Sequence, residues 1–226
     1  MHSSIKTTVN RSEQMVYWIL AICASVIGIW AGYTQFYEGG LGQPNYKILQ
    51  HHHGVEFRHY EPFITASTQP NQSGRPGLRT GFRVLANYIF GGNKPGESLA
   101  MTAPVLQQDG TDETLSMTTS LLTSNEGMTM AFVMPCDKAL QDLPTPNNSS
   151  IQLTQVDWGD VVAIRFSGHG KQHRFQSKEE ELRRILASSQ FEPIGPAVYA
   201  QYNSPRAFPP LRRNEVLIPI AAPSRE

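Results

Sequence analysis

The stretch that decides the fold is residues 82–105, FRVLANYIFGGNKPGESLAMTAPV. In and just before its first part, apolar residues recur at the three- and four-residue spacing of one helix face. They are Leu78, Phe82, Leu85, Ala86 and Ile89. The pair Gly91 and Gly92 follows, and glycine adopts the positive backbone torsion that commonly ends a helix. The sequence therefore predicts a helix over 79–90, a glycine turn, and then a strand over 99–107.

This order of motifs resembles the SOUL, or haem-binding protein, family, whose members carry a helix, a G-x-N turn and an M-T-A-P-V tract. Here the turn ends at Asn93 and the tract is residues 101–105. Residues 46–60 are similar to the family's opening hairpin. Residues 202–205 and 213–216, YNSP and RNEV, are similar to its closing loop and strand. The resemblance extends over about residues 44–221.

The element order predicts one α+β domain over 46–221. Alternation and turn residues favour a hairpin over 46–60 and strands over 62–68, 99–107, 114–122, 128–134, 151–156, 160–166, 196–202 and 215–220. A second helix is predicted over 178–189, with Ser177 and Glu180 as its capping box. The proline-rich residues 135–150 are predicted to be a surface loop. The resemblance implies two pseudo-symmetric β-α-β halves that build a distorted, barrel-like sheet with two outer helices.

Residues 15–33, MVYWILAICASVIGIWAGY, contain no charged residue. At about 1.5 Å per residue they form a helix of roughly 28 Å, close to the hydrocarbon thickness of a bilayer. Tyrosine and tryptophan lie near both ends, as is typical of membrane interfaces. We expect a transmembrane helix over 15–33, preceded by a cytoplasmic segment over 1–14. A cleaved signal peptide is the alternative, but no A-x-A-like site follows the apolar run.

The charges around this span predict its orientation. Lys6 and Arg11 precede it, and Glu38 is the only charged residue between it and Lys47. By the positive-inside rule the N-terminus is cytoplasmic and the domain lies on the outer, periplasmic side. Residues 34–45 are rich in glycine and polar residues, which is typical of a linker. Residues 222–226 form a C-terminal tail.

Composition excludes some classes of function. The 226 residues include 19 Lys+Arg and 19 Asp+Glu, so the formal net charge is zero, and no basic stripe suggests a nucleic-acid partner. Motifs for a serine nucleophile, a phosphate loop, a zinc protease or a redox cysteine pair are not found. The sequence therefore indicates a binding protein and not an enzyme.

The resemblance implies a haem ligand, non-covalent haem b or another tetrapyrrole. In the family the groove lies between the first helix and the loop before the last strand, which here is 203–214. Apolar residues beyond the helix stripe, including Phe90, suggest a second apolar surface, and guanidinium groups pair well with propionates. The predicted groove residues are Arg79, Arg83, Val84 and Tyr88 on the helix, and Arg206, Phe208, Leu211, Arg212 and Arg213 in the loop. The alternative is a solvated basic loop beside a packed helix.

His59 is the candidate ligand for haem iron. Side chains of a strand alternate between faces, so His59 is expected to share the apolar face of Val55 and Phe57. A polar ring there needs a partner, because an unsatisfied buried polar group costs about 1–3 kcal/mol. That partner is haem iron in the functional interpretation, and a backbone carbonyl or a nearby side chain in the structural one. Family members vary at this position.

Other potential ligands are weaker candidates. Residues 51–53 are three histidines in a predicted turn, where neighbouring side chains point in different directions. Methionines that alternate along 128–134 are expected in the core. Cys136 is expected to be half-buried and unpaired, because the other cysteine, Cys23, lies in the apolar span.

The expected function is a membrane-anchored protein that buffers, transfers or senses haem. Two alternatives keep the same fold. In one, the domain binds flat hydrophobic molecules in general, by analogy with gyrase-inhibitor-like modules. In the other, the apolar helix and the arginine-rich loop contact a protein.

Overall fold

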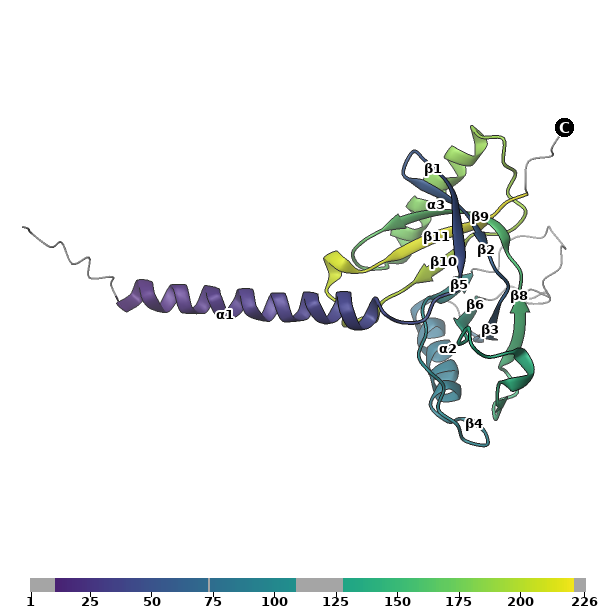
Figure 1. Ribbon diagram of the computed structural model, residues 1–226, viewed down its shortest axis with the longest axis horizontal. Helices are drawn as coiled ribbons and strands as arrows, with labels where there is room; N and C mark the ends of the chain where they lie inside the picture. Colours follow the sequence, from purple (N-terminus) through teal and green to yellow (C-terminus); the bar gives the residue numbers. More distant parts are fainter. Residues whose placement is uncertain (1–10, 73, 109–127, 222–226) are drawn as a thin grey trace, which may run out of the picture.

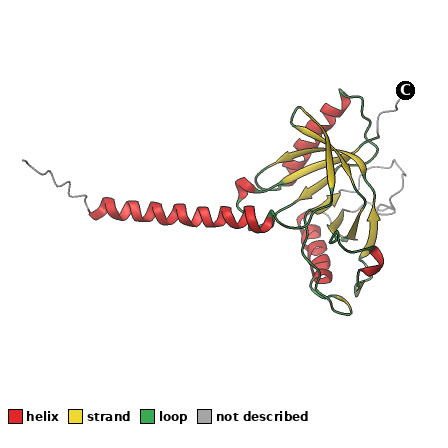
Figure 2. Ribbon diagram, in the orientation of Figure 1, coloured by secondary structure: helices red, strands yellow, loops and turns green. Residues whose placement is uncertain are grey.

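The computed structural model describes residues 11–72, 74–108 and 128–221. A nine-stranded antiparallel sheet curls into a half-barrel, with two helices packed on its outer side and a third, N-terminal helix projecting away from it (Figures 1 and 2). The α+β architecture predicted from the sequence is confirmed.

The sheet has the order β1-β2-β9-β11-β10-β5-β6-β3-β8. Its strands are β1 (Tyr46–His52), β2 (Val55–Tyr60), β3 (Phe63–Thr68), β5 (Val105–Gln108), β6 (Thr129–Val133), β8 (Gln152–Val156), β9 (Gly159–Phe166), β10 (Val198–Gln201) and β11 (Asn214–Pro219). A two-stranded sheet joins β4 (Asn93–Lys94) to β7 (Thr145–Pro146).

The two halves are related by pseudo-symmetry. The first half has the element order β2, β3, α2 (Gly74–Ile89), β5 and β6. The second half has the element order β8, β9, α3 (Gln172–Ala187), β10 and β11. If β1 is left aside, exchanging the two sets reverses the sheet order onto itself. The central contact is the pairing of β5 with β10. The predicted duplication of element order is therefore confirmed.

Several predicted boundaries were wrong. Helix α2 begins at Gly74, not at residue 79, because Pro76 is tolerated in a first helical turn. Helix α3 begins at Gln172, so Ser177 lies inside it, and Lys171 occupies the N-cap position without a side-chain bond. The strand predicted over 99–107 is confined to Val105–Gln108. The strand predicted over 114–122 lies outside the described residues.

Residues 90–102 explain why the G-x-N turn and the M-T-A-P-V tract occur together. Gly91 has a φ of 102°, and a Cβ at Gly92 would lie 2.2 Å from Asn87 Nδ2. Asn93 is buried; its Nδ2 donates to Tyr88 O and Glu97 O at 2.9 and 2.7 Å. The Thr102 hydroxyl donates to Val133 O on β6. The turn and the tract thus fasten the end of α2 to the sheet.

The core consists of three clusters. One lies between α3 and the sheet face formed by β2, β9 and β11, and another lies between α2 and β3 and β6. The third fills the inner face of the curled sheet, with residues such as Tyr60, Val161 and Leu217. The methionines of 128–134 are buried, as predicted. Gly81 allows α2 to pack closely against Pro70, because a Cβ at Gly81 would lie only 2.9 Å from Pro70 Cγ.

A network of buried charges occupies one end of the inner face. Glu215 on β11 is 0% exposed and Arg58 on β2 is 1% exposed. Arg58 donates to both Glu215 oxygens, at 2.7 and 3.0 Å. Arg213 Nε and the Tyr202 hydroxyl donate to the same carboxylate at 2.8 Å each. We call these four residues the Glu215 cluster; it joins β2 to β11 and to the end of the 203–214 loop.

The Glu215 carboxylate is charged in this environment. Burial by itself would raise its pKa, but hydrogen bonds and charge from Arg58 and Arg213 outweigh burial and hold the pKa below its usual value. Burial, together with the negative charge of Glu215, raises the pKa of Tyr202 well above its ordinary value. Burial raises the pKa of Tyr60, whose hydroxyl accepts a bond from Arg58, to about 12.

We predict that Glu215→Gln lowers the free energy of unfolding by about 3–5 kcal/mol, because it removes the buried carboxylate that two guanidinium groups share. Arg58 keeps only the partly exposed Glu56, at 2.7 Å, and Arg213 loses the carboxylate with which it pairs. The matched control is Glu181→Gln on α3, whose carboxylate is exposed and paired with Lys178 at 2.6 Å; it is expected to cost at most about 1 kcal/mol. Urea unfolding followed by circular dichroism measures both values.

The same carboxylate predicts a pH dependence. Since the folded pKa of Glu215 is lowered, its stabilisation is complete above the unfolded value of about 4.3 and is lost as the pH falls through the folded pKa. Below pH ~4.3 the wild-type protein is therefore expected to lose stability more steeply than Glu215→Gln. Equal slopes for the two proteins would contradict an ionised Glu215 in the folded state.

Candidate functional site

The outer face of α2 carries a row of unpaired positive charge. Arg75, Arg79 and Arg83 are spaced by four residues and are exposed, and the helix contains no carboxylate. Within the described part of the chain, no ion pair involves these three side chains. Like charges at this spacing repel one another slightly, so the row favours an anionic partner.

Apolar side chains lie within the same row. Phe82 is 42% exposed and Phe90, just beyond the helix, is 65% exposed. At 3.6 residues per turn, Phe82, Ala86 and Phe90 share an arc of roughly 100° with the three arginines. We call these six residues the α2 stripe. Phe82 was predicted to lie on the face of the helix that packs against the sheet; its ring contacts Phe132 of β6 edge-on, with centroids 5.3 Å apart, but much of it remains exposed.

Two predicted groove residues lie away from this stripe. Tyr88 is fully buried on the inner side of α2, and its hydroxyl donates to Pro144 O at 2.9 Å. Val84 is half-buried and packs against the same core cluster. Both side chains help to pack α2 against the sheet. These apolar residues, which we had assigned to a ligand groove, therefore belong partly to the core.

The 203–214 loop contacts the N-terminal helix. The Ser204 amide and hydroxyl donate to the Glu38 carboxylate at 3.0 and 2.6 Å. The Phe208 amide donates to Thr34 Oγ1 at 2.8 Å. Trp30 Nε1 donates to Arg206 O at 2.7 Å. Each of these partners belongs to α1 (Arg11–Tyr33) or to η1 (Thr34–Glu38), the π-helical turn that continues it.

The arginines of this loop differ in how many of their side-chain N–H groups are already bonded within the protein. Arg213 donates to Glu215, to Gln43 Oε1 at 2.9 Å and to the Tyr46 hydroxyl at 3.2 Å. Arg212 donates to two carbonyls of its own loop, at 3.0 and 2.6 Å. Arg206 and Leu211 are exposed. The two adjacent arginines that we expected to pair with propionates therefore already hold the loop and the Glu215 cluster together.

His59 does not lie in the core. Its side chain is more than half exposed, and Nδ1 lies 2.7 Å from Asp160 Oδ1. Val55 and Phe57 are buried as expected, but they pack in the cluster covered by α3, whereas α2 covers a different cluster. His59 and the α2 stripe thus belong to different parts of the sheet. The partner of the imidazole is the side chain of Asp160, as the structural interpretation of His59 predicted.

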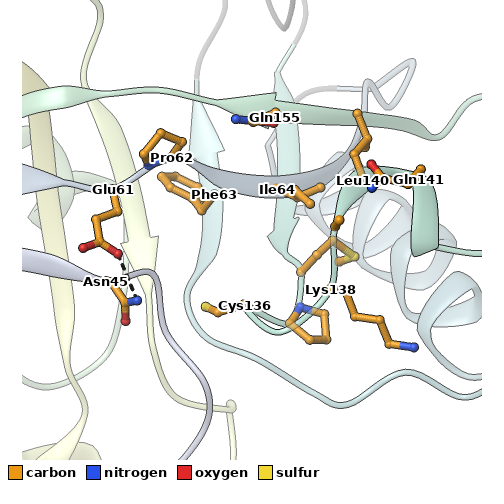
Figure 3. A pocket seen from close by; sticks show the side chains of 13 residues that line it. Asn45, Glu61, Pro62, Phe63, Ile64, Cys136, Lys138, Leu140, Gln141 and Gln155 are labelled. Atoms are coloured by element: carbon orange, nitrogen blue, oxygen red, sulfur yellow. Dashed lines mark hydrogen bonds between the residues drawn. The ribbon is translucent and has the colours of Figure 1, made fainter.

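A hollow of about 300 Å³ lies between the start of β3 and the segment after β6 (Figure 3). Cys136 is on its wall, exposed rather than half-buried as expected, and its Sγ donates to Gln43 O at 3.2 Å. Partial burial and the neighbouring Asp137 raise the pKa of this thiol. Glu61 in the same wall accepts a bond from Asn45 at 3.1 Å. The polar groups that line the hollow are therefore largely paired with the protein.

The described residues contain no cluster of three or more His, Cys, Asp or Glu side chains that could hold a metal ion. His52 ends β1, and His53 and Gly54, with φ of 47° and 80°, form the tight turn to β2. All three histidines of 51–53 are exposed. The interpretation of this triplet as an exposed turn agrees with the structure.

Sequence analysis missed Arg75 and the Glu215 cluster. Arg75 was missed because the helix was predicted to begin only at residue 79; the turn that contains Arg75 has two glycines and a proline. Glu215 directly precedes the apolar residues of NEVLIP, and a charge in an otherwise buried strand indicates a buried partner. Arg58 gives a weaker signal, because Glu56 and His59 of VEFRHY are also polar. That signal was present in the sequence, but pairing the two strands required the sheet order.

Solved structures share the fold at low identity. The EcmrR C-terminal domain matches with a TM-score of 0.54 and 11% identity, covering 78% of this chain and 98% of that one. An uncharacterized conserved protein from Listeria innocua matches with a TM-score of 0.50 and 12% identity, covering 74% and 92%. A hydrolase from Listeria innocua reaches only 0.47 at 11% identity, covering 76% and 94%, and carries no argument about activity.

The sequence comparison is more specific. No curated protein matches the chain. The SOUL heme-binding protein family matches residues 41–219, which include the whole curled sheet, both outer helices and the 203–214 loop. This chain belongs to the SOUL heme-binding protein family.

Proposed function

We propose that this chain is a membrane-anchored protein that binds haem or another tetrapyrrole reversibly, to buffer, transfer or sense it, and that it is not an enzyme. The family match supports the ligand class. The observation that carries the proposal is the α2 stripe, in which three uncompensated arginines share one face with two exposed aromatic rings. A flat apolar molecule with carboxylates complements both features.

The residues of the stripe are suited to contact the carboxylates and the apolar ring surface of a tetrapyrrole, and not to ligate its iron. Guanidinium groups form charge-assisted bonds with carboxylates, and phenylalanine rings cover apolar ring surface. The six residues of the stripe include no histidine, cysteine, methionine or tyrosine, the usual ligands of haem iron. We therefore assign the recognition of the propionates to Arg75, Arg79 and Arg83, and apolar contact to Phe82 and Phe90. His59 is at most an optional ligand.

The proposed anchor is α1. The helix Arg11–Glu38, including the π-helical turn, is long and apolar enough to cross a membrane, a test that a signal sequence also passes. Support for retention comes from Thr34 and Glu38, which are buried at the end of this helix and bond to the 203–214 loop. A cut within this region would remove partners from the folded domain. We propose that the N-terminus is cytoplasmic and the domain periplasmic.

The haem prediction concerns a double variant. Arg79→Gln with Arg83→Gln is expected to weaken haem binding roughly 3- to 30-fold, since exposed charge pairs contribute about 0.3–1 kcal/mol each. An absorbance titration of the Soret band measures the change. The matched control is Arg183→Gln with Arg184→Gln on α3, which is expected to bind haem like the wild type. Thermal unfolding shows whether each variant is folded.

The nature of the ligand contact follows from two further titrations. Metal-free protoporphyrin is expected to bind within about tenfold of haem, because the stripe supplies no iron ligand. The dimethyl ester, which lacks both carboxylates, is expected to bind weakly. If His59→Ala abolishes haem binding in a folded protein, the α2 stripe is not the main site. Equal affinity for the diacid and the ester favours a general binder of flat hydrophobic molecules.

The anchor prediction uses two chains. The intact chain is expected to remain with membranes after carbonate extraction, and its intact mass is expected to include residue 1. A chain beginning at Thr34, which retains the buried Thr34 and Glu38, is expected in the soluble fraction. A reporter fused after Glu226 is expected to be active outside the cytoplasm. Activity of that reporter only in the cytoplasm would contradict the proposed orientation.

A further inference from the structure

We infer that the 203–214 loop is a lipid-contacting element, seated in the phospholipid headgroup layer of the membrane that α1 crosses. The inference rests on the proposed anchoring and goes beyond it. An anchor alone leaves the domain free to lie at any distance and angle from the bilayer. The contacts between the loop and the end of α1 remove that freedom.

The first step is the depth of the contacts along the helix. The 28 residues of Arg11–Glu38 reach about 42 Å at 1.5 Å per residue, whereas a hydrocarbon core is about 30 Å thick. This excess of about 12 Å is shared between the two ends, since residues 11–14 precede the uncharged run 15–33 and residues 34–38 follow it. The last turns of the helix, from about Trp30 onward, therefore pass from the edge of the hydrocarbon core into the headgroup layer. The loop contacts Trp30, Thr34 and Glu38, which lie one turn apart on one side of these last turns. Tryptophan itself favours the interface.

The second step is that the loop cannot move away from the helix without breaking bonds. Trp30 contacts the Phe208 ring, with centroids 5.0 Å apart, and donates to Arg206 O at 2.7 Å. Thr34 and Glu38 are 1% and 5% exposed, so their bonds to the loop are shielded from water. Residues 34–45, which we predicted to be a linker, are thereby joined to the domain. Whatever depth these helical turns occupy, the loop occupies too.

The third step is the chemistry of the exposed surface at this junction. Phe36 is 85% exposed, and Tyr33 and Tyr37 are more than half exposed and stack with centroids 5.0 Å apart. Leu211 is exposed in η3 (Pro209–Leu211) of the same loop. Aromatic rings that are unfavourable in water are stabilised at the membrane interface. Arg206, whose carbonyl accepts the Trp30 bond, has an exposed side chain, and a guanidinium group is suited to bind a lipid phosphate.

Figure 1 is consistent with this placement. The segment that contains η3 lies alongside the last turns of α1, while the β1–β2 turn lies at a distant part of the domain. The partner is therefore the phospholipid surface itself, and the loop fixes which side of the domain faces it.

The test uses the full chain in phosphatidylcholine–phosphatidylglycerol vesicles. In a Cys23→Ser, Cys136→Ser background, a fluorophore is attached at Leu211→Cys or, independently, at Arg206→Cys. The matched control is His53→Cys in the exposed β1–β2 turn. Lipids with a nitroxide on the headgroup are expected to remove most of the emission from positions 206 and 211 and little from position 53. Aqueous iodide is expected to show the opposite order.

The outcomes separate the inference from the proposal on which it rests. If the chain floats with vesicles but positions 206 and 211 respond like position 53, the loop is not in the headgroup layer and the inference fails while the anchor stands. If the chain does not float, the anchor fails and the inference with it. Agreement between the two loop positions shows that neither label has displaced the loop by itself.

Discussion

The structure depends on one buried carboxylate. Glu215 receives bonds from two guanidinium groups and a tyrosine hydroxyl while it is fully shielded from solvent. Removing three charges from water is costly, so such a network stabilises the fold only if its bonds are all made. Its position also breaks the pseudo-symmetry of the sheet. Strand β6, the counterpart of β11, contains no charged residue, so the network distinguishes two halves that otherwise have the same strand order.

The same carboxylate connects the sheet to the N-terminal segment. Arg213 bonds to Glu215 on one side and to Gln43 and Tyr46 on the other. Nine residues earlier, Ser204 bonds to Glu38. The closing loop is therefore held at both ends, by the buried network and by the end of α1. This arrangement explains why Arg212 and Arg213, which were predicted to bind a ligand, bond within the protein.

The sequence could predict both outer helices, the duplicated order and the role of the glycine turn, because these depend on local spacing. It could not predict how far along a strand the outer helix covers the face of the sheet. The alternation that placed His59 with Val55 and Phe57 was right about the two apolar residues, but the cover provided by α3 does not extend to the end of β2. The prediction of the candidate site had similar errors. Tyr88 and Val84 face the core, and Arg75 was not predicted because its turn contains glycine and proline. Contacts between segments distant in sequence decided the burial of His59, Tyr88 and Val84, whereas Arg75 was missed for a local reason.

The two outer helices show how equivalent places acquire different surfaces. Helix α3 carries three carboxylates among its basic residues and compensates part of its positive charge, since Lys178 pairs with Glu181 at 2.6 Å and Arg183 with Glu179 at 2.8 Å. Helix α2 has three arginines and no carboxylate, and the Phe82 ring beside Arg83 and the Phe90 ring just beyond the helix are exposed. Nothing in the fold requires this difference, because both helices bury a similar apolar face. The uncompensated charge on α2 is unfavourable by itself, so its presence is most simply explained by an anionic, apolar partner.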